Sequence, residues 1–286
     1  MRIPIVALIL IVGILFSPLL SPVRAVEKVQ VVVSILPQTY FVKQIGGHLV
    51  NVISMLPEGG LPHTYEPTPQ QMKLLSAADL YVRIKVDFEN AWWEKMKTAN
   101  PNMNVVDSTE GVEFINEHDQ HSHHGRNPHI WLSPRMVKIQ AEHIYQGLVT
   151  VDPEHKNTYQ TNKEAFLIAL DKLDHDIQEQ LAVLNTRKFM VFHPAWSYFA
   201  RDYGLEQIPI EIEGKEPGAK EMAALVTIAR KEQITIIFVQ PQTSRRSADT
   251  IAKQIGAIVE ILDPLAADWM GNMQQVTNTL AEALSK

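Results

Sequence analysis

The sequence predicts an α/β protein of two lobes, with mainly parallel sheets flanked by helices, joined by one long α-helix. In both halves of the chain, short β-branched runs alternate with segments of helical period, which is typical of mostly parallel sheets. Between the halves, apolar residues repeat every three or four positions over roughly 30 residues, which corresponds to a helix of about 45 Å. A helix of that length can connect two lobes as a stiff spacer.

The composition limits the chemistry open to the chain. Its 286 residues are 45% hydrophobic, enough for a substantial core in one or two domains. The formal net charge of −6 gives no electrostatic support for a nucleic-acid partner. The chain has no cysteine, which excludes disulfides, thiolate zinc sites and cysteine nucleophiles. Any metal ion must therefore be bound by imidazole and carboxylate groups.

Residues 1–25 are typical of a signal peptide. Arg2 gives a basic start, residues 5–16 are apolar, and Val23-Arg24-Ala25 fits a small-residue cleavage site. The alternative is a membrane anchor, but the apolar segment is shorter than the ~20 residues of a spanning helix. No cysteine follows the signal, so lipid attachment there is not expected. We expect a mature chain that begins near Val26 and is exported as a soluble periplasmic protein.

The first lobe is expected over residues 26–150. Its predicted strands are 29–36, 49–56, 79–86 and 103–106, and its predicted helices are 40–45, 69–77 and 90–97. The run that begins at Val29 is β-branched and therefore indicates a buried strand. Residues 57–69 are rich in proline and glycine, which indicates a shaped loop, and Thr68-Pro69 is a favourable start for a helix. Ser133-Pro134 opens a further helix with an apolar face.

The linking helix is expected within residues 151–186 and the second lobe over residues 187–286. Asp152-Pro153 opens the long helix, whose apolar period continues to Leu184. The second lobe has predicted strands at 188–192, 207–212, 234–239 and 258–262. Its predicted helices are 196–203, 219–232, 247–255 and 268–284. The two halves are therefore alike in the order of their elements.

Four residues share a setting that suits metal binding. His63, His129 and His193 each lie beside a proline, near the end of a predicted strand or just before a helix, and Asp263 follows a strand and precedes Pro264. Ligands bind open α/β sheets beyond the carboxyl ends of the strands, and a neighbouring proline restricts the backbone. Three imidazoles and a carboxylate are a reasonable shell for Zn²⁺ and an acceptable one for Mn²⁺ or Fe²⁺. Each histidine taken singly could be an ordinary turn residue.

A histidine-dense segment at 117–124 is a second candidate for metal binding. It contains four histidines: His118, His121, His123 and His124. Flexible imidazole clusters bind Zn²⁺, Cu²⁺ and Ni²⁺ with little selectivity. We interpret this segment as an auxiliary metal-collecting loop, and the alternative is a solvated loop with no role. No function is assigned to the remaining histidines, which lie on polar faces or in turns: His48, His143, His155 and His175.

Enzymatic motifs are scarce in this sequence. It has no G-x-S-x-G, no phosphate-binding glycine loop and no His-Glu-x-x-His. A zinc-dependent hydrolase stays open, because three protein ligands and one open position make a catalytic zinc site, whereas a fourth protein ligand closes the site and favours binding. The acidic residues Glu211, Glu213 and Glu216 are interpreted as part of a solvated loop.

Motifs spread over nearly the whole mature chain resemble those of one known family. They are residues 62–69 (PHTYEPTP), 127–134 (NPHIWLSP), 192–193 (FH), 198–205 (YFARDYGL), 213–219 (EGKEPGA), 237–242 (IFVQPQ) and 261–265 (ILDPL). The chain resembles the metal receptors among the periplasmic substrate-binding proteins, which serve zinc and manganese ABC transporters. The chain departs from the family pattern at Lys85, where glycine is common, and at Gln240, where glutamate is usual.

The resemblance implies two α/β lobes joined by a long helix, with the metal ion in the cleft between them and His63, His129, His193 and Asp263 as its ligands. Members that prefer Mn²⁺ usually carry a carboxylate at the position of His193, and the histidine-rich loop is typical of the zinc branch. The implied function is capture of Zn²⁺, with Mn²⁺ as the alternative, and delivery to a membrane ABC permease by a monomer without enzymatic activity. Whether Glu66 or a water molecule completes the shell stays open. We expect metal affinity to fall as pH drops through about 6.5.

Overall fold

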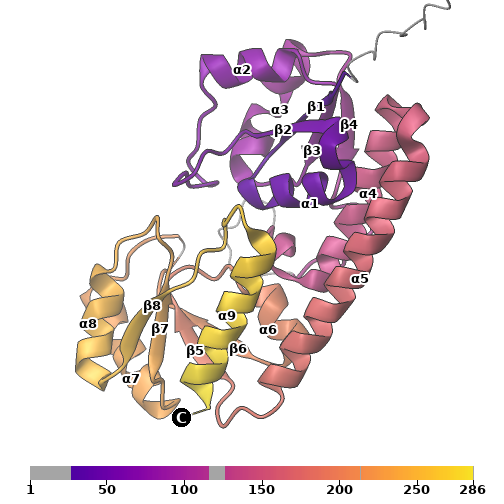
Figure 1. Cartoon of the computed structure of the whole chain (residues 1–286). Coiled ribbons are helices and arrows are strands. Elements are labelled where there is room, and N and C mark those ends of the chain that lie inside the picture. Colours follow the sequence, from indigo (N-terminus) through magenta and orange to yellow (C-terminus); the bar gives the residue numbers. More distant parts are fainter. Residues whose placement is uncertain (1–26, 116–125, 213, 286) are drawn as a thin grey trace, which may run out of the picture.

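The computed structural model describes residues 27–115, 126–212 and 214–285. Two four-stranded parallel sheets lie in two lobes, and a long helix runs along one side of both (Figure 1). The predicted fold class is confirmed. The proposed signal peptide and the histidine-dense segment lie outside the described residues. Across the described ranges, every helix is too short or too polar to cross a membrane.

The first sheet has the strand order β2-β1-β3-β4, and all its neighbouring strands are parallel. Its strands are β1 (Val29–Val33), β2 (Val50–Ser54), β3 (Leu80–Arg83) and β4 (Asn104–Asp107). The helices that connect them are α1 (Leu36–Gly46), α2 (Pro69–Ser76) and α3 (Asp87–Ala99). Carboxyl ends of parallel strands share one edge of a sheet, so the loop between β2 and α2 and the turn between β3 and α3 leave the sheet on the same side.

The second sheet repeats this order as β6-β5-β7-β8, again with parallel neighbours. Its strands are β5 (Lys188–Val191), β6 (Glu206–Pro209), β7 (Ile236–Val239) and β8 (Ile258–Ile261). Its helices are α6 (Ser197–Tyr203), α7 (Ala219–Lys231), α8 (Arg246–Ile255) and α9 (Trp269–Leu284). The two lobes therefore share one topology, as the order of elements in the sequence indicates.

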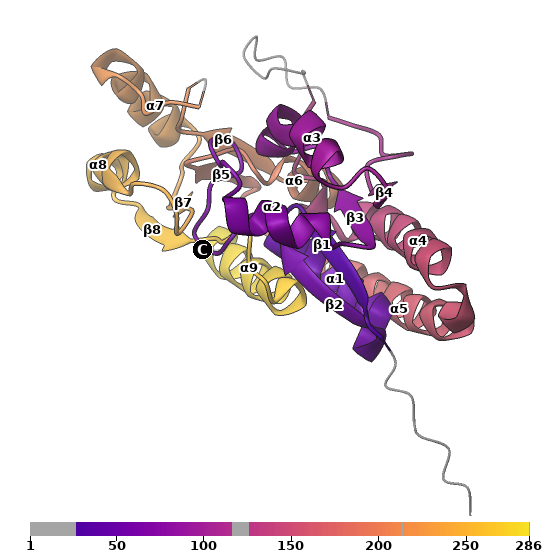
Figure 2. The same cartoon turned by 90° about the horizontal axis from the view of Figure 1, so that it is seen from above.

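Two helices connect the lobes. Helix α4 (Pro134–Val151) begins after Ser133, whose hydroxyl accepts the backbone N–H of Met136, and a 3₁₀ turn (Pro153–His155) leads into α5 (Lys156–Leu181). Helix α5 packs against α1 and α4 at one end and against α6 and α9 at the other (Figures 1 and 2). A single stiff element thus supports both lobes, although it is shorter than the predicted 155–184.

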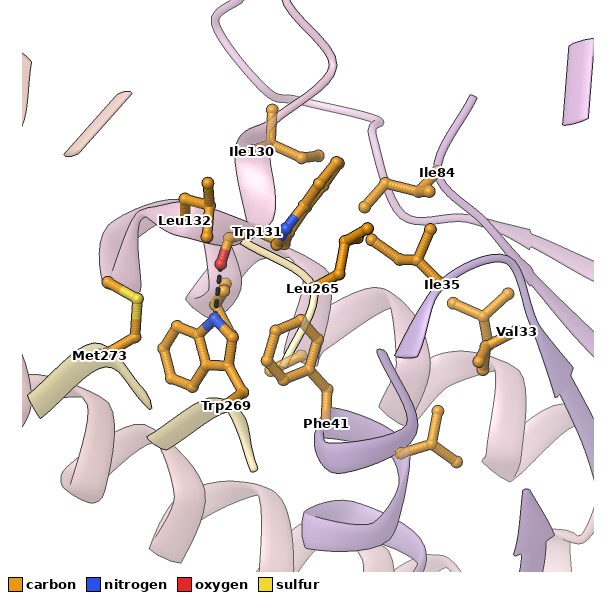
Figure 3. Packing of buried hydrophobic residues seen from close by; sticks show 14 of the residues in the cluster. Val33, Ile35, Phe41, Ile84, Ile130, Trp131, Leu132, Leu265, Trp269 and Met273 are labelled. Atoms are coloured by element: carbon orange, nitrogen blue, oxygen red, sulfur yellow. Dashed lines mark hydrogen bonds between the residues drawn. The ribbon is translucent and has the colours of Figure 1, made fainter. Parts of the chain in front are cut away.

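One apolar core extends across the junction of the lobes. Trp131, in a 3₁₀ turn (Ile130–Leu132), donates its indole N–H to the carbonyl of Pro264 at 2.6 Å. Its own carbonyl accepts the indole N–H of Trp269 at 2.7 Å (Figure 3). The ring of Phe41, from α1, lies edge-on to Trp269 with 5.2 Å between the ring centroids. Residues from the first lobe, the central segment and the last helix therefore pack as one unit.

The second lobe has a further, separate core on the outer face of its sheet. Met190 and Ile237, on β5 and β7, pack there with Ile251 of α8, and all three are fully buried. Their strand neighbours Phe189 and Phe238 point to the opposite face and join the core at the junction. This alternation follows from the period of two along a β-strand.

Several predicted boundaries differ from those observed. The first predicted strand ended at residue 36, whereas Leu36 already belongs to α1. The side-chain oxygen of Gln38 accepts the backbone N–H groups of Ser34 and Ile35, which ends the strand and starts the helix. The strand predicted at 207–212 ends at Pro209, although the backbone N–H groups of Ile210 and Glu211 still donate to the carbonyls of Val191 and Phe192 at the end of β5.

Candidate metal centre

Three loops bring three histidines together in the cleft between the lobes. His63 lies between β2 and α2, His129 immediately precedes the Ile130–Leu132 turn, and His193 follows β5. One ring nitrogen from each histidine lies within 4.8 Å of the other two. The cleft that they line has a volume of about 350 Å³. The structure thus joins residues that are 130 positions apart in the sequence.

The distances between the Nε2 atoms match those of ligands around a small cation. The Nε2 atom of His193 is 3.2 Å from that of His129 and 3.4 Å from that of His63. Zinc–nitrogen bonds of 2.0–2.1 Å at tetrahedral angles place two nitrogen atoms about 3.3 Å apart. The three rings are therefore spaced as a tetrahedral ion requires along two of the three edges.

The hydrogen bonds at Nδ1 determine which nitrogen atoms carry protons. The Nδ1 atom of His63 lies 2.6 Å from a carboxylate oxygen of Asp87, and that of His193 lies 2.6 Å from one of Glu211. An ionised carboxylate only accepts, so both Nδ1 atoms carry the proton. In the neutral rings the Nε2 atoms then present lone pairs toward one another, an arrangement that a bound cation stabilises.

His129 is held in the same tautomer by an amide. Its Nδ1 atom is 2.9 Å from the side-chain oxygen of Asn127, which also accepts the backbone N–H of His129 at 2.9 Å. Because that backbone group can only donate, the Asn127 atom is an acceptor and Nδ1 must be the donor. Asn127 is in turn bonded to the hydroxyls of Ser197 and Tyr198, on α6 of the second lobe.

The three histidines differ in their exposure to solvent. The side chains of His63 and Asp87 are 44% and 47% exposed, whereas those of His193 and Glu211 are 15% and 12% exposed. His129 is buried, and Trp131 packs beside its ring. Burial, and to a lesser degree the neighbouring histidines, holds the pKa of His129 well below 6.5. His129 therefore stays neutral, as a metal ligand must, when an exposed histidine would already be charged.

The fourth residue that the sequence singled out lies outside this group. One carboxylate oxygen of Asp263 accepts the backbone N–H of Leu265 at 2.9 Å and lies 3.5 Å from the side-chain nitrogen of Gln242. Gln242, Gln240, Pro264 and Leu265 line the cleft, so Asp263 is next to residues of the cleft wall. Glu66 is exposed in the loop of His63 and is not a member of the histidine group.

The other histidines considered in the sequence analysis form two groups. His118, His121, His123 and His124 lie outside the described residues. Those without an assigned function include His143, which bonds the carbonyl of Glu110, and His155, which bonds Asp152 at the α4–α5 turn. Neither belongs to the histidine group in the cleft.

Sequence reasoning missed the partners of the histidines. Asp87 begins α3, Glu211 was interpreted as part of a solvated loop, and Asn127 was noted only within a motif. The available signal was the position of these two carboxylates, because Asp87 directly follows the predicted strand 79–86 and Glu211 lies near the end of the predicted strand 207–212. Their pairing with particular histidines, 24 residues away for Asp87 and 18 for Glu211, depends on how the loops that carry them are folded.

Lys85, which stands where glycine is common in the family, is held in place by local contacts. Its φ of 61° lies in the left-handed region that favours glycine. Its backbone N–H donates to the buried carboxylate of Glu89 at 2.7 Å, and its ammonium group pairs with Asp107 at 2.5 Å. Lys85 and Asp107 line an open hollow of about 690 Å³ that contains none of the three clustered histidines. Lys85 is therefore not a residue of the metal centre.

Two parallel α/β lobes with three imidazoles converging between them define a two-lobed binding protein for a metal cation. The family model described as zinc-uptake complex component A, periplasmic (ZnuA) matches residues 31–283. The chain belongs to this family.

Individual relatives agree with this assignment. The chain is 30% identical over 257 residues to the high-affinity zinc uptake system protein ZnuA of Bacillus subtilis (strain 168), covering 84% of this chain and 79% of that protein. It is 31% identical over 258 residues to the zinc-binding lipoprotein AdcA of Streptococcus pneumoniae (strain ATCC BAA-255 / R6), covering 85% of this chain but only 51% of AdcA. A crystal structure of ZnuA matches with a TM-score of 0.87 and 46% identity, covering 91% of this chain and all of that chain.

Proposed function

We propose that the chain captures one Zn²⁺ ion between its lobes and delivers it to a membrane ABC permease. The ligands in this proposal are the Nε2 atoms of His63, His129 and His193. The protein acts as an exported, periplasmic monomer, and the metal ion is its cargo. Family membership assigns it to the uptake components, which bind a metal ion and catalyse no reaction.

The arrangement of the imidazoles supports this proposal most directly. All three rings donate through Nδ1 to an acceptor and direct Nε2 at a common point. A histidine that only stabilises a fold needs one satisfied hydrogen bond, and nothing in that role requires three lone pairs to converge. The shared point is a cation site built before the cation arrives.

Asp263 is proposed as the carboxylate of the fourth position, directly or through a water molecule. It lies beside Pro264 and Leu265 of the cleft wall, and its carboxylate is already oriented by Leu265. One carboxylate added to three imidazoles gives a closed four-coordinate site, which suits binding rather than catalysis.

Zinc is favoured over manganese by the nitrogen-rich ligand set. Imidazole suits Zn²⁺, whereas Mn²⁺ prefers carboxylate, carbonyl and water ligands. His193 occupies the central position, where its Nε2 atom is close to both other rings. The names of ZnuA and AdcA refer to zinc, and this agrees with the donor set.

A competition titration with Zn²⁺ and Mn²⁺ on the metal-free protein tests the proposal, with His193→Glu and Asp263→Ala alongside. We expect one tight equivalent of Zn²⁺ in the wild type, a shift toward Mn²⁺ in His193→Glu, and weaker Zn²⁺ binding in Asp263→Ala. Preference of the wild type for Mn²⁺ would contradict the zinc assignment. Turnover of ester or peptide substrates by the zinc-loaded protein would instead indicate a hydrolase.

Deletion of residues 118–124 separates the cleft from the histidine-dense segment. We expect the deletion to keep the tight equivalent and to remove weaker, additional binding. Loss of the tight equivalent would show that the segment supplies a ligand to the main site.

A further inference from the structure

We propose that Ser197 is a positioning residue of the metal centre, because its hydroxyl joins the support of His129 to the loop of His193 and so sets the spacing of the two rings. This inference rests on the proposed function, since it gives a role to a residue that contacts neither the metal ion nor the ring of a ligand. Ser197 is the first residue of α6 and lies 70 positions from Asn127, the residue that holds the ring of His129.

The hydroxyl of Ser197 has a full set of hydrogen bonds. Its oxygen accepts a side-chain N–H of Asn127 at 3.0 Å and one of Gln207 at 2.5 Å, and its proton is donated to the carbonyl of Pro194 at 3.3 Å. A hydroxyl has one proton to donate and two lone pairs that accept, so these three bonds match its capacity. The hydroxyl is therefore held in one orientation.

On one side, this hydroxyl supports His129. Asn127 is buried, and its side-chain oxygen accepts both the backbone N–H and the Nδ1 proton of His129. The nitrogen of the same amide donates to Ser197. A buried amide that is bonded at both ends keeps its plane, so the acceptor for Nδ1 stays aligned with the ring. The next residue, Tyr198, donates its hydroxyl to the backbone carbonyl of Asn127 at 2.8 Å, so α6 holds both the main chain and the side chain of Asn127.

On the other side, the hydroxyl bonds the residue that follows His193. The carbonyl of this residue, Pro194, accepts from Ser197 and also from the side chain of Gln207, on β6, at 3.1 Å. The side-chain oxygen of Gln207 accepts the backbone N–H of Trp196 at 3.0 Å. Gln207 therefore fastens the loop to β6, and Ser197 connects the loop to the central segment.

The connection bears on the metal ion because the Nε2 atoms of His129 and His193 lie 3.2 Å apart. Both atoms present lone pairs, so the surrounding structure must hold the rings together before a cation binds. The bonds from Asn127 and Glu211 orient each ring, whereas the distance between the rings depends on contacts between the segments that carry them. Ser197 makes such a contact directly.

A second serine at the junction provides a matched comparison. Ser133 donates its hydroxyl to Asp202 and therefore also joins the central segment to α6. It accepts the backbone N–H of Met136, and neither of these two partners holds a histidine of the cleft. If Ser197 only docked α6 on the rest of the protein, the two serines would be equivalent for zinc binding.

Titration of the protein with Zn²⁺ against a competing chelator measures the role of Ser197. We expect Ser197→Ala to weaken zinc affinity about tenfold, and Ser197→Thr, which keeps the hydroxyl, to stay within about twofold of the wild type. Ser133→Ala should also stay within about twofold, because it leaves the support of His129 intact. Thermal unfolding of the metal-free variants compares their stability, which both alanine changes should lower.

A double-mutant cycle tests whether Ser197 acts through Asn127. In the background of Asn127→Ala, Ser197→Ala should change zinc affinity by less than about twofold, because the contact that it removes is already absent. The loop of His193 keeps its bonds from Gln207 in both backgrounds.

The outcomes separate this inference from the proposed function. An unchanged zinc affinity in Ser197→Ala, an equal loss in Ser197→Thr or Ser133→Ala, or an equal loss in both backgrounds of the cycle overturns the role of Ser197 while the wild type still binds one equivalent of zinc. Failure of the wild type to bind one equivalent of zinc overturns both.

Discussion

The two lobes have the same strand order but distribute their apolar side chains differently. In the first sheet, consecutive residues of β1, including Val32 and Val33, belong to one core that continues across the junction to Trp131 and Trp269. In the second sheet, alternate residues of β5 belong to different cores, with Phe189 on the junction side and Met190 on the outer side.

Because of this difference, His129 and His193 are each held in place by a different core. His129 is followed by Ile130 and Trp131, which belong to the core at the junction. His193 is preceded by Phe192, which belongs to the outer core of the second lobe. The metal centre is therefore held by two cores that can be perturbed separately.

The largest expected effect is at Trp131. Trp131→Ala removes a buried ring and the hydrogen bond from its indole N–H to the carbonyl of Pro264, which connects the central segment to the end of the chain. We expect the free energy of unfolding to fall by about 3–5 kcal/mol and zinc affinity to fall with it, because the ring packs beside His129. Urea unfolding and zinc titration measure the two effects. An unchanged zinc affinity would show that the junction does not position His129.

A substitution in the outer core gives the contrasting result. Ile251→Ala should lower the free energy of unfolding by about 2–4 kcal/mol, because a fully buried side chain is lost from α8. Zinc affinity should decrease by less than in Trp131→Ala, since Ile251 is not a residue of the cleft wall. Equal losses of zinc affinity in the two variants would contradict the independence of the two cores.

The pH dependence of the free energy of unfolding of the metal-free protein tests the burial of His129. Its pKa is held well below 6.5 in the folded state, so below pH 6.5 the unfolded chain binds a proton that the folded chain does not. The free energy of unfolding should therefore fall as pH drops below 6.5, by at most about 1.4 kcal/mol per pH unit from this group. Urea unfolding of the wild type and of His129→Gln between pH 5 and 7 measures this dependence on pH. The slope should be smaller in the variant, and an equal slope would assign the effect to other groups.

The smallest expected effects are at two helix caps, Ser133 at the junction of the lobes and Thr68 within the first lobe. Ser133 accepts the N–H of Met136 and donates to Asp202 on α6, whereas Thr68 accepts the N–H of Gln71 within its own lobe. Thr68→Ala should lower the free energy of unfolding by about 1 kcal/mol. Ser133→Ala should lower it by more, because this change also removes a hydrogen-bond donor to Asp202. Thermal unfolding measures both, and a larger loss in Thr68→Ala would contradict the role of the contact with Asp202.

Local patterns in the sequence determined much of this protein. The β-branched runs, the proline-rich loop before α2 and the helical period of α5 predict two α/β halves and a connecting helix, because they depend on residues close in sequence. The same patterns place His63, His129 and His193 in loops near strand ends or before helices. Boundaries such as the start of α1 at Leu36 were missed, because Gln38 ends the strand through its side chain.

Only the tertiary structure decided how these histidines are used. The choice of Nε2 rather than Nδ1 depends on Asp87, Asn127 and Glu211, and the difference between His63 and His193 depends on the exposure of each pair. Asp87 and Glu211 lie 24 and 18 residues from the histidines that they contact, and the histidines themselves come together across up to 130 residues. Sequence patterns report what a residue does within its own strand, helix or loop, whereas protonation and burial depend on the residues that folding brings beside it.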